Sequence, residues 1–141
     1  MPPEPKLKRA FRLILGLSMV AVGVLHFVEP SGFVKIVPGW LPAPLLLVQV
    51  SGFFEIAGGL GLLVGRVHRA AAWGLIALYV AVFPANINMA VNDIQPEGGH
   101  IPTALLWLRL PFQALFIGLA WWLSRSPSTS PSTSPSTPGD P

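Results

Sequence analysis

The sequence has no cysteine and few charged residues. The absence of cysteine among its 141 residues excludes disulfides, thiol redox chemistry and thiolate metal sites. Charged residues make up 11% of the chain, against about 25% in a typical soluble domain. No nucleophile–base arrangement, phosphate loop or dinucleotide motif is recognisable. These absences favour a protein that is not an enzyme on its own.

Hydrophobic residues, in contrast, make up 52% of the sequence and gather in four runs. The runs cover about residues 10–28, 45–65, 70–91 and 103–123. As helices, they are long enough, or nearly so, to cross about 30 Å of hydrocarbon. They leave no room for a soluble domain. The sequence therefore predicts one all-α, integral membrane four-helix bundle over residues 9–123.

The two ends of the chain differ from this region. Residues 1–8 are expected to be disordered, and no small-residue cleavage site follows the first run, so we expect that run to remain as a helix. Residues 124–141 repeat a Ser-Pro-Ser-Thr unit and have no apolar residue to bury. Such a composition predicts a disordered tail.

The basic residues predict the orientation of the bundle. They lie before the first run, between the second and third, and after the fourth: Lys6, Lys8, Arg9, Arg12, Arg66, Arg69 and Arg125. By the positive-inside rule, both termini are cytoplasmic. The net charge of +3 is then explained by orientation in a lipid bilayer, and we expect no nucleic-acid partner.

Glu55 is the one charged residue in the second run. Its neighbours at helical spacing are Ser51, Gly52, Gly58 and Gly59, which are all small. Small residues let a second helix approach closely, so Glu55 is expected to face a helix–helix contact. Because an unpaired buried charge is costly, the carboxylate should be paired with Arg109 or protonated.

The other helices each place a polar residue in the same half of the bundle. At about 1.5 Å per residue, Arg109, Asn86 and Gln113 lie near the depth of Glu55, and His26 lies nearer the outer surface. Two prolines inside helices, Pro84 and Pro111, should create kinks close by. We therefore expect a ligand-binding or proton-handling pocket, covered from outside by the apolar connection 30–44. The residues expected to line it are His26, Glu55, Asn86, Arg109 and Gln113. A metal site at His26, Glu29, Asp93 and His100 is a weak alternative, and no metal is expected.

Five stretches resemble the DoxX-like family of small four-helix membrane proteins. They are "GVLHFVEPSGFVKIVPGWLP", "SGFFEIAGGLGLL", "FPANINMA", "LRLPFQ" and the following "WW". The family takes its name from a membrane subunit linked to thiosulfate:quinone oxidoreductase. The resemblance implies a four-helix bundle in the bacterial inner (cytoplasmic) membrane, near the quinone pool.

Two functions remain open. In the first, the pocket binds quinone or another small molecule within a membrane redox complex that includes a partner protein. Glu55 would then handle a proton, while Arg109, Asn86 or Gln113 would bond the carbonyl oxygens. In the second, the protein is a scaffold subunit or small-solute carrier with a structural Glu-Arg cluster. Such a subunit could form a homo-oligomer through Gly61 and Gly65.

Overall fold

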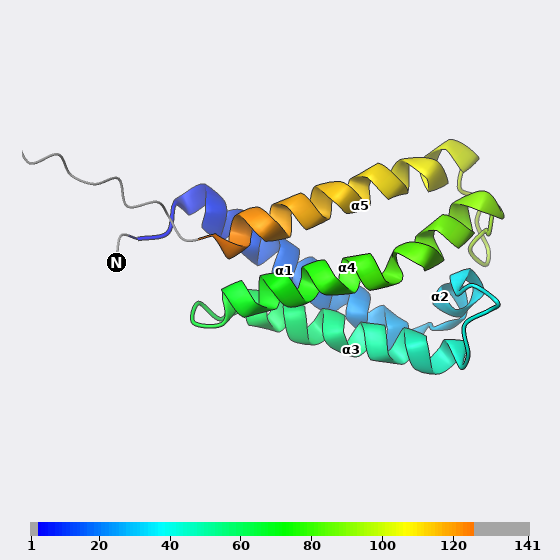
Figure 1. Ribbon diagram of the computed structural model, residues 1–141, viewed down its shortest axis with the longest axis horizontal. Coiled ribbons are helices and arrows are strands. Elements are labelled where there is room, and N and C mark those ends of the chain that lie inside the picture. Colours follow the sequence, from blue (N-terminus) through cyan, green and yellow to red (C-terminus); the bar gives the residue numbers. More distant parts are fainter. Residues whose placement is uncertain (1–2, 126–141) are drawn as a thin grey trace, which may run out of the picture.

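The computed structural model describes residues 3–125, and the regular secondary structure within them is helical (Figure 1). The helices are α1 (Lys6–Val28), α2 (Ser31–Ile36), α3 (Pro44–Leu63), α4 (His68–Val91) and α5 (Thr103–Ser124). All except the short α2 are long and apolar enough to cross a membrane. At 1.5 Å per residue these four are about 30–36 Å long, which matches the hydrocarbon core. The predicted all-α architecture, with four helices long and apolar enough to cross a membrane, is confirmed.

The observed helices extend slightly beyond the predicted runs at several ends, but α3 ends at Leu63, before the predicted Gly65. α1 begins at Lys6, inside the stretch 1–8 that was expected to be disordered, and α5 reaches Ser124. The remainder of the predicted disordered tail, residues 126–141, lies outside the described residues. α3 begins with Pro44 at its first turn, where proline is favoured because the missing N–H has no partner in a helix anyway.

Basic side chains explain why α1 begins early. The Lys8 ammonium donates a hydrogen bond to the carbonyl of Arg125, and the Arg12 guanidinium donates one to the carbonyl of Leu62. These carbonyls belong to the last turns of α5 and α3, where they lack helical partners and attract cations. Arg12 also pairs with Glu4 at 3.0 Å. Lys8 and Arg12, which were expected to orient the chain in the membrane, therefore also connect the ends of α1, α3 and α5. We name this end, where α1 begins and α5 ends, the terminal end of the bundle.

α1 and α3 touch along their backbones. Gly16 and Gly23 of α1 lie against Gly59 and Gly52 of α3. A Cβ on Gly59 would lie 2.6 Å from the carbonyl oxygen of Gly16, and a Cβ on Gly23 would lie 2.7 Å from that of Gly52. Glycine is required at these positions because any side chain would push the helices apart.

α3 and α4 form a hairpin that opens away from its turn. Near the turn, Gly58 faces Leu75 and Gly61 faces Ala71. Gly61 was expected to contact a second copy of the protein, but it packs against α4 of the same chain. A Cβ added to Gly65 would meet nothing within 4 Å. Beyond these contacts the two helices diverge toward α2, which lies between their separated ends (Figure 1). We name this the α2 end of the bundle.

Two apolar clusters hold the ends of the bundle. The cluster toward the terminal end joins all four long helices through Leu15, Met19, Leu62, Ala72, Leu75, Tyr79 and Leu123. The cluster toward the α2 end joins α2, α4 and α5 through Ile36, Met89, Ala90 and Leu106. The space between α3 and α4 lies between the two clusters.

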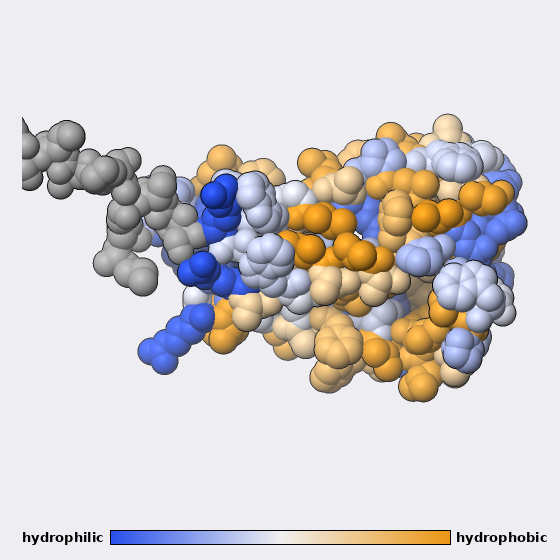
Figure 2. Space-filling model, in the orientation of Figure 1, coloured by the Kyte–Doolittle hydropathy of each residue, from blue (hydrophilic) through white to orange (hydrophobic). Residues whose placement is uncertain are grey.

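The surface shows a broad apolar region with hydrophilic residues gathered toward its two ends (Figure 2). This distribution is expected of a protein surrounded by lipid. From the basic residues of the sequence, we predict that reporter domains fused after Asn92 and after Arg125 report opposite sides of the membrane, with the Arg125 fusion in the cytoplasm. Two reporters on the same side would contradict a final span between them.

Candidate functional site

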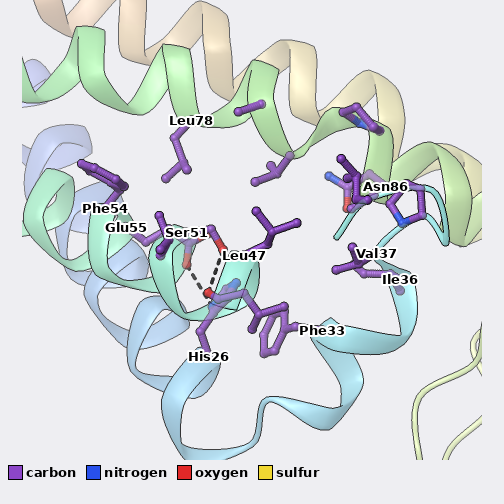
Figure 3. Close-up of a pocket in the computed structure, with 18 of the residues that line it drawn as sticks. His26, Phe33, Ile36, Val37, Leu47, Ser51, Phe54, Glu55, Leu78 and Asn86 are labelled. Carbon is purple, nitrogen blue, oxygen red and sulfur yellow. Dashed lines mark hydrogen bonds and ion pairs between the residues drawn. The ribbon is translucent and has the colours of Figure 1, made fainter. Parts of the chain in front are cut away.

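A cavity of about 440 Å³ lies between the diverging halves of α3 and α4. α1, α2 and Arg109 of α5 complete its wall, and Figure 3 shows His26 and Phe33 on one side with Leu78 and Asn86 across from them. Its lining is mostly apolar. The polar lining residues are His26, Ser51, Glu55, Asn86 and Arg109. Four of the five residues predicted to line a pocket therefore do so, and Gln113 is the exception.

Glu55 contacts His26. The glycine contact between α1 and α3 places His26 so close to Gly52 that a Cβ on this glycine would lie 2.5 Å from the His26 Cβ. His26 Nδ1 is 3.2 Å from Glu55 Oε2, and both residues are buried. Within residues 3–125 no salt bridge joins Glu55 to Arg109, so of the two expected alternatives the pair with Arg109 is not formed, and the protonated carboxyl stays a prediction. The reason is the register of two touching helices, which brings His26 deeper beside Glu55 than its place in the sequence indicated.

The hydrogen bonding of this pair is incomplete. His26 Nδ1 also lies 2.9 Å from the carbonyl oxygen of Val22, so one ring nitrogen faces two acceptors. Among the described residues, Glu55 Oε2 is a buried side-chain atom with no hydrogen-bond partner. A buried polar atom without a partner costs free energy. Because Glu55 lines the cavity, a bound molecule with a polar group could supply that bond.

Phe33 of α2 was not recognised as a site residue from the sequence. Its ring stacks on the His26 imidazole, with 3.8 Å between ring centroids and 23° between planes. The apolar composition of the connection 30–44 did predict a cover over the pocket, and Phe33, Ile36, Val37, Pro38 and Leu41 line the cavity. Which of these residues would touch His26 could not be read from composition.

Gln113 serves the contact between α4 and α5. Asn86 Nδ2 donates to Gln113 Oε1 at 2.7 Å, and Gln113 Nε2 donates to the carbonyl oxygen of Tyr79. Pro84 removes the N–H that would bond the carbonyl of Val80, so Gln113 bonds α4 next to this irregular turn. Gln113 faces a second cavity, of about 150 Å³, between α4 and α5. Its predicted place in the larger cavity was wrong.

Arg109 reaches the cavity from α5. Its Nη1 lies 3.7 Å from Met89 Sδ, which is a weak acceptor. No carboxylate forms a salt bridge with it within residues 3–125. A guanidinium has five N–H donors, so Arg109 can bond an oxygen of a bound molecule. In the same range, no group of three or more His, Asp or Glu side chains could hold a metal ion.

Comparison with known protein families gives a match that covers most of the chain. The family model of a domain of unknown function, DUF8561, matches residues 15–124. The chain belongs to the DUF8561 family. The matched region of this DUF8561 domain includes the glycine contact, both apolar clusters and the cavity. No curated protein and no solved structure matches the chain. The resemblance to DoxX-like proteins therefore stays a prediction, and the function has to be argued from the cavity.

Proposed function

We propose that this DUF8561 protein binds a small, mostly apolar molecule with a polar head, such as a quinone, inside the membrane. The observation that carries the proposal is the space beside Glu55. A structural ion cluster needs balanced charges but no cavity, whereas about 440 Å³ lies next to this carboxylate. Ligand sites are typically apolar cavities of about 300–1,000 Å³ with a few placed polar groups.

The polar groups are arranged to hold such a head. Arg109 comes from α5 and the His26–Glu55 pair comes from α1 and α3, so the cavity is approached by polar side chains from different helices. Arg109 can donate to a carbonyl oxygen of the bound molecule. The carboxyl–imidazole pair can share a proton, donate it to the head or accept it, which is the usual chemistry of these groups. Glu55 and His26 would thus handle the proton, and Arg109 would position the head.

The cellular setting is part of the proposal. The order of the motifs that resemble the DoxX-like family supports a place in the bacterial inner membrane with a redox partner protein nearby, and the distribution of basic residues supports cytoplasmic termini. A second candidate is a scaffold or carrier in which the cluster is structural. It is favoured by the Asn86–Gln113 and His26–Glu55 contacts, which join neighbouring helices without any ligand.

A thermal-shift titration in detergent with decylubiquinone tests the binding proposal. A ligand at about 100 times its Kd stabilises the folded state by about 2.7 kcal/mol, so the Tm of the unaltered protein should rise. Val82→Trp fills the cavity wall and should abolish the shift. Val24→Trp, at an exposed position of α1 outside the cavity, should keep it. Equal shifts in both variants, or none in the unaltered protein, would count against the proposal.

A further inference from the structure

The wall of the cavity is exposed along one side. On α3, the lining residues Leu47, Val50 and Phe54 are 38%, 44% and 55% exposed. Across from them on α4, the lining residue Ala81 is also exposed. These residues lie inside the spanning helices, where an exposed surface faces lipid.

The register of the hairpin explains this opening. Residues spaced by three or four share a helix face, so Phe54 continues the face of α3 that carries Gly58. Gly58 contacts Leu75 of α4, and Leu75 continues on α4 toward Leu78 and Ala81. The two faces touch near the turn and separate beyond it, which leaves a lateral gap between Phe54 and Ala81.

The end of the cavity toward α2 is covered instead. Ile36 and Pro38, in the connection 30–44 that contains α2, line the cavity and are buried. Asn88 Nδ2 of α4 donates to the Ile36 carbonyl oxygen at 2.9 Å. α2 is thus held to α4 over the cavity.

An ion pair ties α2 to the connection between α4 and α5 as well. Lys35 Nζ lies 2.8 Å from Glu97 Oε1. The hydrogen bond and charge of Lys35 lower the pKa of Glu97, so the Glu97 carboxylate is charged at neutral pH and the contact weakens only as the pH falls through that lowered value. Exposed pairs of this kind contribute little alone, and here the pair adds to the Asn88 bond and to the Phe33–His26 stack.

We infer that the cavity is filled from the bilayer, through the opening between α3 and α4, by an amphiphile with a polar head and a hydrocarbon tail. The head lies toward His26, Glu55 and Arg109, and the tail passes between Phe54 and Ala81 into the lipid. The identity of the head group rests on the proposed function. The lateral route does not rest on it, because the route follows from which side of the cavity wall is exposed.

The tail has a specific energetic role in this arrangement. A tail that stays in lipid before and after binding loses no hydrophobic contact, so its burial adds little to the affinity. It instead confines the molecule to the bilayer and raises its concentration at the opening. Selection among ligands then falls to the few polar groups in the cavity, which are costly to leave unpaired in an apolar surrounding.

Thiol labelling in liposomes tests the route directly, since the chain has no cysteine of its own. Ser51→Cys places a thiol of similar size in the cavity wall. We expect N-cyclohexylmaleimide dissolved in the bilayer to label it, and a charged maleimide that does not cross membranes, applied to both sides, to label it at least about tenfold more slowly, a factor equivalent to 1.36 kcal/mol in barrier. Ala72→Cys, at a fully buried position, gives the background rate.

A matched pair of second substitutions locates the opening. Ala81 and Ala77 are both exposed alanines one turn apart on α4, but only Ala81 lines the cavity. Adding Ala81→Trp to Ser51→Cys should slow labelling by the maleimide at least about tenfold, and adding Ala77→Trp should not. Equal rates in these two variants, faster labelling by the charged reagent, or no labelling from lipid would each overturn the route.

The same assay separates this inference from the proposed function. Decylubiquinone should protect Ser51→Cys from the maleimide, and the tailless ring at the same total concentration should protect it less. Equal protection by both would overturn the role of the tail. Labelling from lipid without protection by either would leave the lateral route in place and reject a quinone head.

Discussion

Leucine in place of Gly59 is expected to separate α1 from α3 and to destabilise the folded protein by about 3 kcal/mol, the upper end of the usual cost of overpacking. The Cβ alone would lie 2.6 Å from the Gly16 carbonyl oxygen and 2.9 Å from the backbone nitrogen of Val20. Backbone atoms of a packed helix cannot move aside as a flexible side chain can. Reversible unfolding in detergent measures the loss.

Gly74→Leu provides the control for this substitution. Gly74 lies in α4, and a Cβ there would meet nothing within 4 Å. Leucine at this position should be tolerated or slightly stabilising, because glycine is a poor residue in a helix interior. If both substitutions change the stability equally, the effect comes from leucine in a membrane helix and the close contact between α1 and α3 is wrong.

The second large effect is expected at the His26–Glu55 pair. His26→Phe keeps an aromatic ring against Phe33 but leaves the buried Glu55 carboxyl without the His26 contact, and a buried polar group left without a partner costs about 1–3 kcal/mol. Adding Glu55→Leu removes the stranded group. The double variant should therefore recover much of the loss, with a coupling energy of about 1–3 kcal/mol in the unfolding cycle.

The matching cycle pairs Glu55→Leu with Arg109→Gln. Both residues line the cavity, but they form no salt bridge, so their coupling should be clearly smaller than that of Glu55 with His26. The reverse order would show that the sequence-based pairing of Glu55 with Arg109 was right after all. Additivity in both cycles would mean that Glu55 is not paired at all in the folded protein.

The sequence predicted the spans well because hydrophobic runs report directly on the thickness of the bilayer. It predicted less well which way the polar residues face. Counting residues along a helix gives a height but no rotation, so Gln113 was assigned to the cavity although it faces Asn86. The pairing of α1 with α3 was also missed, although glycines seven residues apart on both helices, Gly16 and Gly23 with Gly52 and Gly59, carry that information.

The role of the apolar connection before α3 was predicted in outline. Its hydrophobic residues indicated a cover for the bundle, and α2 does line the cavity. The stacking of Phe33 on His26 depends on how the chain turns at Glu29 and Pro30 after α1, which is a tertiary feature. The unpartnered oxygen of Glu55 could likewise not be read from the sequence, since it depends on the position of every neighbouring donor.

A structure of the protein in lipid nanodiscs with decylubiquinone tests the central claim most directly. The account predicts density for the ring in the cavity between α3 and α4, with one oxygen near Arg109 or Glu55 and the tail leaving between Phe54 and Ala81. A cavity closed by side chains, with Glu55 sealed against His26 and the quinone absent or bound elsewhere, would contradict it.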